Sequence, residues 1–408
     1  MEKDVKQGNT LIVRGPTRVT LLEGKLEVLG KIILPEKGEA PSKEKNLKSN
    51  VLIVPSAISY PLFALADSKL EIYTNDEENL EEIPQNTISD EWIKIKDSLI
   101  DKIKKNEGKP PLKIMVLGIS SGKTTLISYL ANNFIREGFQ GAYLDSDLGQ
   151  QIVLPTTIMI GLIKKPFVSL KEINDGERHF VGATFPKGNL KFIISHYTKE
   201  MIENFLKVHD QGRFILIDTD GWVKTEAGSI YKNFFIKKVD PDALIVFYDK
   251  EIEEYGVIIK KAKERKDRQI LLINEKNNFF YDKSKEERRF LRQSRFAQVF
   301  EEFKKITIPL DGLQFIKRDY DIESDEIIEV EINVNNLVRL PYHYVIIGLC
   351  DENSKLLNVG LLFTANIEKN YILFFSEMSY KEQIKIKKIL LGSLRLSTKG
   401  NHQGYLYL

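Results

Sequence analysis

The chain has 408 residues, which is enough for two or three domains, and its formal net charge is only +2. So small a net charge provides no global field for nucleic acid, and the single cysteine, Cys350, excludes an intrachain disulfide framework or a cysteine-rich zinc site. The scattered histidines lack the paired spacing of a histidine metal site. No apolar run could span a bilayer and no signal peptide is apparent, so a soluble intracellular protein without membrane contact is expected.

Residues 1–85 are predicted to form a β-rich domain. Short aliphatic and β-branched runs alternate there with glycine and proline, a pattern typical of strands separated by tight turns. The expected strands are Thr10–Val13, Arg18–Leu22 and Leu26–Leu29, with turns at Gly15-Pro16 and Glu23-Gly24. The stretch 35–50 is rich in lysine, glutamate, proline and serine and is expected to be an exposed loop.

Residues 86–312 are predicted to form an α/β domain. A helix is expected after Ser89, the predicted N-cap, because apolar residues then recur at helical spacing. Its expected buried face is Trp92, Ile95, Leu99 and Ile103. From residue 112 onward strand patterns alternate with helical ones, as a mostly parallel sheet requires. The expected strands are 114–117, 142–144, 214–217, 243–247 and 270–273.

Residues 313–408 are predicted to form a small, β-rich C-terminal domain. Strands are expected at 344–349, 357–363 and 372–375, and the lysine-rich segment 380–391 is expected to be helical. The predicted fold class is therefore α/β: a central P-loop NTPase domain with a mostly parallel sheet, flanked by a β-rich domain on either side in the chain.

A phosphate-binding loop follows the expected strand 114–117. The segment from Leu117 to Thr125 has the sequence LGISSGKTT and leads into a helical pattern. Strand, tight loop and helix N-terminus together form the setting in which backbone N–H groups bind a triphosphate. Lys123 is predicted to reach the β- and γ-phosphates of ATP or GTP, and Thr124 to bind Mg2+. The predicted nucleotide-binding residues are Gly118, Ser120, Ser121, Gly122, Lys123, Thr124 and Thr125.

The start of this loop departs from the usual glycine, four residues and Gly-Lys-Ser/Thr. Leu117 stands at the usual first glycine, and Gly118 follows one position later. Either Leu117 replaces that glycine and crowds the triphosphate, or Gly118 is the glycine and the loop is one residue short. The second description is favoured because Leu117 continues the apolar run of the strand. Either departure is expected to weaken transfer more than nucleotide binding.

Two acidic segments follow expected strands, at the sheet edge where parallel α/β folds bind ligands. Asp145 and Asp147 lie in the sequence DSDLGQ, residues 145–150, and are predicted to serve Mg2+ binding and proton transfer. Asp218 directly follows the strand 214–217 and is predicted to hold Mg2+. For both segments the structural alternative is a turn or helix cap, which aspartate and glycine also favour.

Two further features could contact a polynucleotide. Trp222 follows a turn, and stacking of its ring on a nucleobase would be worth roughly 1–3 kcal/mol, with core packing as the alternative. Arg288, Arg292 and Arg295 are spaced i, i+4 and i+7, so they share one face of an expected helix. Such a face can clamp phosphates and stabilise charge on a transferred phosphoryl group, or it can be an ordinary solvated helix.

The order of these motifs resembles the polynucleotide 5′-hydroxyl kinase family. That family includes the RNA kinase of the eukaryotic pre-mRNA 3′-end cleavage machinery, its ribosomal-RNA-processing relative and their archaeal counterparts. The resemblance rests on Gly122-Lys123-Thr124, on Asp-x-Asp-x-Gly-Gln at 145–150, on Thr-x-Gly-Trp at 219–222 and on the arginine-rich segment 288–295. Residues 180–184 are similar to a family strand and turn, and the N-terminal domain is similar more weakly.

This resemblance implies transfer of the γ-phosphate of ATP or GTP to the 5′-hydroxyl of RNA or DNA. On this basis Lys123 and Thr124 hold the triphosphate and Mg2+, Asp218 is a further metal ligand, and Asp145 or Asp147 accepts the proton. Asp145 is also a candidate metal ligand. The residues implied to contact the acceptor are Gln150, Thr219, Trp222 and Arg295, and those implied to close over the phosphates are Arg288 and Arg292.

The resemblance also implies RNA-processing protein partners, with a cytoplasmic location in an archaeon or a nuclear one in a eukaryote. Two other functions fit the nucleotide loop. One is a nucleotide-bound scaffold subunit of an RNA-processing complex, with little or no turnover. The other is a P-loop NTPase of the metallochaperone class, which the lack of cysteine and histidine clusters disfavours.

Overall fold

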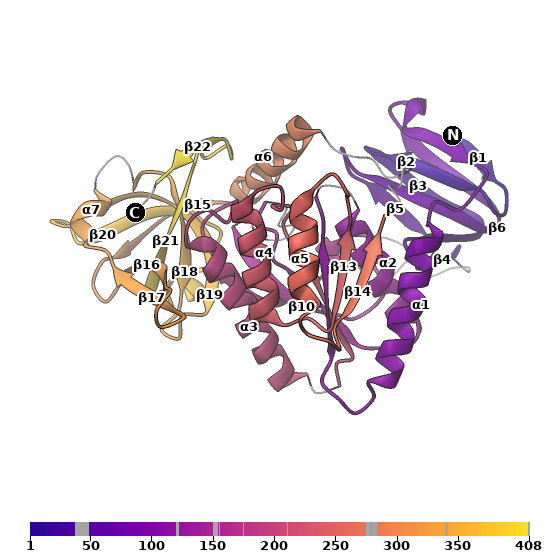
Figure 1. Ribbon diagram of the computed structural model, residues 1–408. Coiled ribbons are helices and arrows are strands. Elements are labelled where there is room, and N and C mark those ends of the chain that lie inside the picture. Colours follow the sequence, from indigo (N-terminus) through magenta and orange to yellow (C-terminus); the bar gives the residue numbers. More distant parts are fainter. Residues whose placement is uncertain are drawn as a thin grey trace.

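The computed structural model describes residues 1–36, 49–119, 122–149, 154, 156–173, 175–209, 211–274, 279, 284–338 and 342–406. Figure 1 shows three sheets in a row, with the central α/β domain between an N-terminal and a C-terminal β domain. The predicted α/β class is confirmed by this arrangement. None of the helices in the described ranges combines the length and apolarity needed to cross a membrane.

The N-terminal sheet has its strands in the order β4-β3-β6-β2-β7, with β1 against β6 and β5 against β3. Its strands are β1 (Glu2–Val5), β2 (Thr10–Arg14), β3 (Thr17–Val28), β4 (Lys31–Ile33), β5 (Val51–Val54), β6 (Ser59–Thr74) and β7 (Leu80–Ile83), with the short helix η1 (Glu77–Asn79) before β7. The predicted turn at Glu23-Gly24 is wrong, because β3 continues through it. The register shifts there, and Gly24 has φ +94° beside the Asp67 backbone, so the segment is a bulge.

The central sheet carries the phosphate loop and has the strand order β11-β10-β9-β12-β8-β13-β14. Five of its strands are mutually parallel: β8 (Leu112–Leu117), β9 (Gly141–Asp145), β12 (Phe214–Asp218), β13 (Ala243–Phe247) and β14 (Gln269–Ile273). All five were expected from their apolar runs. Two further strands, β10 (Thr157–Ile163) and β11 (Gly176–Phe180), extend one edge antiparallel.

Helices cover both faces of the central sheet. The helices α1 (Asp90–Lys105) and α2 (Lys123–Arg136) bury their apolar sides on one face. The other face is covered by α3 (Leu190–Val208), α4 (Glu226–Val239) and α5 (Glu253–Ala262). The predicted N-cap is confirmed, since the Ser89 side chain accepts from the Trp92 N–H. With both faces covered, the carboxyl ends of the parallel strands are where a ligand can enter.

The C-terminal sheet begins earlier in the chain than the predicted boundary at 312. Its first strand, β15 (Lys304–Pro309), pairs with β20 (Tyr371–Ser376). The other strands are β16 (Gln314–Asp321), β17 (Glu326–Glu331), β18 (Val345–Cys350), β19 (Leu356–Asn366), β21 (Lys388–Leu396) and β22 (His402–Tyr405). The helix predicted over 380–391 is wrong: only α8 (Tyr380–Gln383) is helical, and β21 begins at Lys388 because its apolar residues pair with β18 in the core.

The helix that carries the arginines, α6 (Lys285–Glu301), bridges the central and C-terminal domains (Figure 1). Its Phe296 and Phe300 are buried in one apolar cluster with residues of the C-terminal sheet, including Ile346 and Leu394. At the opposite end of the molecule, Asn132 of α2 donates to the backbone carbonyl of Leu29, which fixes the N-terminal domain against the central one. Both outer domains therefore pack firmly on the domain that carries the phosphate loop.

Candidate active site

The phosphate loop begins at Gly118. Leu117 is the last residue of β8 and is fully buried in the apolar core, so it belongs to the strand. Gly118 has no room for a side chain, since a Cβ there would lie 2.7 Å from Cβ of Phe247. This arrangement supports the description in which Gly118 is the first glycine and the loop is one residue short. Ser120 and Ser121 lie outside the described residues.

The end of the loop holds a buried lysine. Gly122 has φ +95°, a conformation that glycine adopts without strain, and it leads directly into α2. Lys123 is only 4% exposed, and its Nζ donates to the carbonyl oxygen of Gly118 at 2.9 Å. The ammonium group is therefore held across the base of the loop, beside the N-terminus of α2, where a helix and its free N–H groups attract phosphate.

A hydroxyl and a carboxylate meet next to the loop, as the sequence predicted. Thr124 Oγ1 donates to Oδ2 of Asp218 at 2.7 Å, and Asp218 is 3% exposed. The other carboxylate oxygen, Oδ1, is buried and has no hydrogen-bond partner within the part of the chain that the structure describes. Burial raises the pKa of Asp218 to about 6, against the opposing effect of Lys123. A bound cation would satisfy this oxygen and favour the charged carboxylate.

Asp145 and Asp147 lie beside Asp218 at the same sheet edge. Asp145 ends β9, and its Oδ1 accepts from the Asp147 N–H at 3.0 Å. Asp147 Oδ1 in turn accepts from the Gly149 N–H at 2.9 Å, so the turn presents both carboxylates in a fixed geometry. Burial raises the pKa of both groups, and the neighbouring carboxylates add to the effect on Asp145. Carboxyl groups tuned upward in this way suit proton acceptance near neutral pH.

The residues present fit Mg2+. Within the described ranges, no three carboxylate, imidazole or thiolate side chains lie close enough together to form a metal site alone. That arrangement suits Mg2+, which is usually held by one or two protein groups together with substrate phosphates and water. Thr124 and Asp218 would supply the protein groups, and the oxygen of Asp218 that has no hydrogen-bond partner among the described residues would be satisfied by the cation.

The turn after β12 has two different sides. The Thr219 side chain points inward, where its hydroxyl donates to the carbonyl of Val116 at 2.8 Å, and the residue is 1% exposed. It therefore positions the turn and is not open to a polynucleotide, contrary to its predicted role. Trp222 is half-buried, with its ring centroid 4.7 Å from that of Phe185 and 5.9 Å from that of Tyr231. The tryptophan thus combines a packed face with an edge near the surface.

A buried ion pair supports this turn from below. Lys232 of α4 is fully buried, and its Nζ lies 2.9 Å from Oδ2 of Asp220. Oδ1 of Asp220 accepts from the Trp222 N–H at 2.9 Å, so the pair fixes the backbone that presents the tryptophan. Burial lowers the pKa of Lys232, and Asp220 opposes that effect. Lys232 also acts electrostatically on Asp147, which connects α4 to the candidate proton acceptor.

The arginines of α6 approach the carboxylates from above. Arg295 is half-buried and lines the same cavity as Asp145 and Asp147; burial lowers its pKa, whereas these two carboxylates raise it. Arg292 lies beside the Asp147–Gly149 turn, since its Nη1 is 3.9 Å from the position of a Cβ at Gly149. Arg288 lies nearer the N-terminus of α6, and Gln150 lies outside the described residues.

Thr124, the three carboxylates and Arg295 face one cavity of about 760 Å3. Its floor is formed by Thr124, Thr125, Asp145, Asp147 and Asp218, and α6 contributes Phe290, Leu291 and Arg295. The third wall comes from the N-terminal domain and includes Arg18, Ile53, Tyr60 and Tyr73. The guanidinium of Arg18 lies 5.8 Å from the centre of the Tyr73 ring, which places a cationic and an aromatic group together.

Sequence reasoning missed several of these residues for different reasons. Lys232 had a usable signal, because it falls on the buried stripe of α4 with Gly228, Phe235 and Val239 at helical spacing. A lysine on such a stripe requires a buried partner. Arg18 and Tyr73 carried no such signal, since only the packing of the N-terminal domain on the central one brings them to the site. Phe185 carried none either, because it meets Trp222 from a separate loop of the central domain.

The site combines a phosphate loop between strand and helix, a hydroxyl–carboxylate pair suited to Mg2+ and arginines on a covering helix, which are the parts found in P-loop phosphotransferases. The family model described as mRNA cleavage and polyadenylation factor CLP1 P-loop matches residues 118–302. This match, together with relatives named polyribonucleotide 5′-hydroxyl-kinase, supports the resemblance to the polynucleotide 5′-hydroxyl kinase family that the motifs had indicated.

The relatives span most of the chain. A polyribonucleotide 5′-hydroxyl-kinase of Pyrococcus furiosus is 28% identical over 341 residues, which cover 73% of this chain and 91% of the relative. One from Methanocaldococcus jannaschii is 26% identical over 339 residues, with 74% and 91% covered. The CLP1 homolog 5 of Arabidopsis thaliana is 25% identical, with 74% and 70% covered. The fold is similar to a chain in the solved wild-type Clp1p–Pcf11p complex, with a TM-score of 0.69, 14% identity and 97% of each chain covered.

Proposed function

We propose that this protein is a polynucleotide 5′-hydroxyl kinase that transfers the γ-phosphate of ATP or GTP to the 5′-hydroxyl of RNA or DNA. One observation carries the proposal: Lys123, the Thr124–Asp218 pair and the Asp145/Asp147 turn converge on a single sheet edge beneath the arginines of α6. Relatives named polyribonucleotide 5′-hydroxyl-kinase, similar over most of the chain, support the same activity.

The residues divide the work of phosphoryl transfer. Lys123 and the free N–H groups of α2 bind the phosphates, and Thr124 and Asp218 would hold Mg2+, which neutralises charge on the β- and γ-phosphates when it is bound. The acceptor 5′-oxygen forms a bond to the γ-phosphorus as the bond to the bridging β–γ oxygen breaks, and the nucleoside diphosphate leaves. The hydroxyl proton passes to Asp145 or Asp147, whose buried positions suit it to that step.

The arginines and the tryptophan act on the two substrates from the open side. Arg292 and Arg295 lie above the Asp145–Gly149 turn, where a guanidinium can stabilise charge on the transferred group. Arg288 extends this face of α6 toward its N-terminus. Trp222, fixed by Asp220, provides a ring on which the terminal base of the acceptor can stack, and Gln150 is the remaining residue that the family resemblance assigns to acceptor binding.

The direct test is transfer of labelled γ-phosphate from ATP and from GTP to matched RNA and DNA oligonucleotides with 5′-hydroxyl ends. We expect a phosphorylated product that Lys123→Ala abolishes and that a chelator of Mg2+ prevents. Asp145→Asn and Asp147→Asn are compared by their pH–rate profiles, because loss of the base removes the rise in rate with pH. Absence of transfer with every acceptor and metal tried would refute the proposal.

A nucleotide-bound scaffold is the second candidate, favoured by one observation. The loop that begins at Gly118 is one residue short, so it offers the triphosphate one backbone N–H fewer than the usual loop does. A scaffold would retain ATP through purification and show no turnover, and its capture of RNA-processing proteins would survive Asp145→Ala. The kinase would lose transfer with that same substitution, so one variant separates the two functions.

A further inference from the structure

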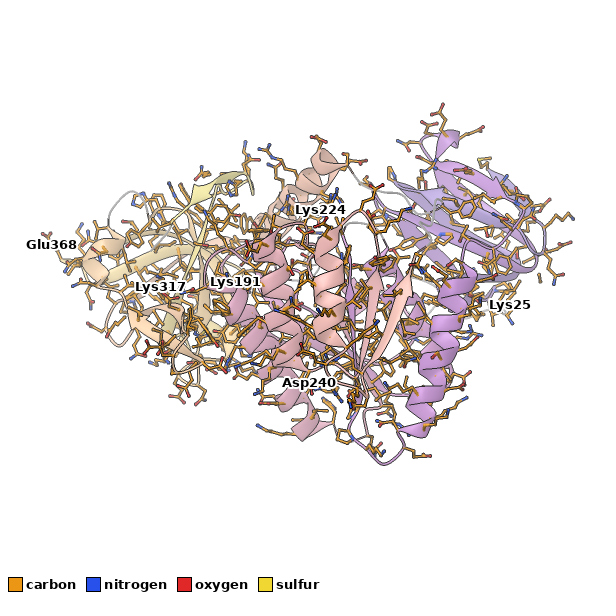
Figure 2. The ribbon with its side chains drawn as sticks, viewed as in Figure 1. Lys25, Lys191, Lys224, Asp240, Lys317 and Glu368 are labelled. Carbon is orange, nitrogen blue, oxygen red and sulfur yellow. The ribbon has the colours of Figure 1, made fainter. Side chains whose placement is uncertain are left out.

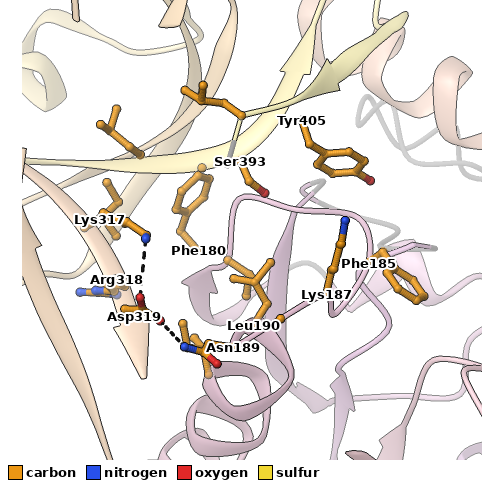
Figure 3. Close-up of a pocket in the computed structure, with 17 residues that line it drawn as sticks. Phe180, Phe185, Lys187, Asn189, Leu190, Lys317, Arg318, Asp319, Ser393 and Tyr405 are labelled. Carbon is orange, nitrogen blue, oxygen red and sulfur yellow. Dashed lines mark hydrogen bonds and ion pairs between the residues drawn. The ribbon is translucent and has the colours of Figure 1, made fainter. Parts of the chain in front are cut away.

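A second cavity, of about 490 Å3, lies where the central domain meets the C-terminal domain. Figure 3 shows Phe180 and Leu190 on its central-domain side and Ser393 and Tyr405 on its C-terminal side. Its inner wall is apolar, since Val181, Ile193, Leu390 and Leu391 also line it. This volume is in the range of pockets that enclose a small ligand.

The two domains cannot separate easily around this cavity. The Ser393 N–H donates to the carbonyl of Gly182 at 2.9 Å, and a Cβ at Gly182 would lie 2.3 Å from Cα of Gly392. The backbones of the turn after β11 and of β21 therefore touch directly, which only glycine permits. The cavity is thus a formed feature of the interface.

The acidic group at the rim is already neutralised. Asp319 accepts from Nδ2 of Asn189 at 2.8 Å and lies 3.6 Å from Nζ of Lys317, as Figure 3 shows. Arg318 pairs with Glu329 at 3.0 Å. Lys187 also lies at the rim and is seen there beside Phe185 (Figure 3).

Two further lysines extend this positive charge. Lys191 is the second residue of α3, at the junction of the domains with Lys317, and Lys224 lies farther along the central domain (Figure 2). Among the described residues that line the cavity, Lys187, Lys317 and Arg318 are cationic and Asp319 is anionic, a balance that complements an anionic chain.

The cavity continues from the candidate acceptor site. Phe185 lines it, is 42% exposed, and packs against Trp222 with the ring planes tilted by 44° and the ring centroids 4.7 Å apart. The adjacent Thr184 hydroxyl is 2.9 Å from the hydroxyl of Tyr405, which also lines the cavity. An aromatic path thus runs from the tryptophan proposed to hold the terminal base to the mouth of the cavity, with Lys187 beside it.

We propose that this cavity binds bases of the acceptor strand on the 3′ side of its terminal nucleotide. Phe185 and the apolar wall receive a base, and Lys187 faces the phosphodiester that follows the 5′-terminal nucleoside. The inference rests on the proposed kinase function for the position of the 5′ end. A single nucleic-acid strand offers bases to the apolar interior and phosphates to the cationic rim. The path from Trp222 to the cavity gives the direction in which this nucleic-acid strand runs.

The test uses a 5′-hydroxyl oligoribonucleotide of eight nucleotides, labelled with fluorescein at the 3′ end, and the nucleoside adenosine as a short acceptor. Lys187→Glu and Ser393→Phe, which fills the cavity, should each raise the KM of the octanucleotide about 5- to 20-fold, the loss of one stacked base. The KM of adenosine should change less than about twofold, because adenosine has neither the phosphodiester that Lys187 faces nor a second base for the cavity. Lys207→Glu, the same charge reversal at an exposed site on α3, is the matched control and should leave both substrates unchanged.

Equal octanucleotide KM values for Lys187→Glu and Lys207→Glu would overturn the inference, and would leave the cavity to a protein segment. Fluorescence anisotropy of the labelled octanucleotide measures binding without turnover, so it decides the inference even if the wild-type protein transfers no phosphate. A wild-type protein that binds the octanucleotide but transfers no phosphate would refute the kinase proposal alone. If Ser393→Phe fails to fold, Lys187→Glu still gives the answer.

Discussion

The phosphate loop and the carboxylates at the ends of the parallel strands form one part of the site, which we call the strand edge. The other part is the covering helix α6, and the two parts place positive side chains beside the same carboxylates in different ways. Lys123 is fixed within its own loop by a bond to Gly118, and Asp218 and Asp145 follow directly from adjacent strands of one sheet. The arginines of α6 stand outside that sheet, and the helix is held by Phe296 and Phe300 in the core of the C-terminal domain. One part of the site is therefore set by local sequence, and the other by contacts between distant segments.

Because of this difference, substitutions in the two regions should have different effects: loss of an interaction at the strand edge, and displacement of the arginines at α6. The strand edge has buried charges with fixed partners, so a substitution there should remove an interaction outright. The helix α6 meets the loop before β22, where a Cβ at Gly400 would lie 2.8 Å from the Ala297 nitrogen and from Cβ of Phe296. A substitution there should move the arginines by a small amount and leave every interaction of the strand edge intact. Substitutions in the two regions can therefore break or sharpen the contrast.

The largest effect is expected from Lys232→Met, because it leaves Asp220 buried without its cation. Removing one partner of a buried ion pair typically costs about 3–5 kcal/mol. We expect a loss of that order in the free energy of unfolding, measured by urea denaturation, together with a weaker Trp222 platform. The double variant Lys232→Met/Asp220→Asn should recover part of the loss. Lys237→Met, at an exposed position on α4, is the control. Equal stability of the single and double variants would show that the buried charge is not the cause.

Lys123→Ala should affect function more than stability. Loss of one preorganised charge at the phosphates is expected to lower kcat/KM about 10²- to 10³-fold and to weaken triphosphate binding measured by calorimetry. Arg292→Ala, on α6, should lower kcat while triphosphate affinity stays within a few-fold of wild type. Lys94→Ala, an exposed lysine on α1, serves as the control. If both active-site variants lost affinity equally, the distinction between strand edge and α6 would fail.

The sequence predicted the strand edge far better than its surroundings. The apolar runs located β8, β9, β12, β13 and β14, and the residues at their ends, Lys123, Thr124 and Asp218, lie together as expected because parallel strands end at one edge. Strand β10 was missed because it follows β9 without an intervening helix and pairs antiparallel with it, which breaks the alternation of strand and helix.

The rest of the site depends on tertiary contacts. Thr219 was assigned to acceptor binding through the motif that it shares with Trp222, whereas its own hydroxyl turns inward to Val116. Tyr73 reaches the cavity from the N-terminal sheet, and Phe185 meets Trp222 from a separate loop. No local pattern encodes such meetings, since they follow from how three sheets pack.

Asp218→Asn should stabilise the protein while it removes transfer. Burial raises the pKa of Asp218 to about 6, so the folded protein holds this proton more tightly than the unfolded chain does. The charged carboxylate therefore destabilises the metal-free protein as pH rises through 6. At pH 8 the variant should gain on the order of 1–3 kcal/mol, and the gain should shrink as pH falls toward 4. Thermal unfolding across this range, with Asp101→Asn at an exposed site as control, measures it. A gain that does not change with pH would show that ionisation of Asp218 is not its cause.

The smallest effect, and the sharpest test of how α6 is held, is Gly400→Ala. Gly400 has φ +78°, so alanine there is strained by about 1–2 kcal/mol, and its Cβ would also press on Ala297 of α6. Gly312→Ala is the matched control, because Gly312 has φ +75° in the same domain and nothing lies within 4 Å of its Cβ position. Both variants should lose stability, Gly400→Ala the more because its Cβ also meets α6, but only Gly400→Ala should lower kcat, with the KM for the triphosphate unchanged. Equal kcat values would mean that the Gly400 contact does not determine where the arginines lie, and that the phenylalanines of α6 are sufficient to position them.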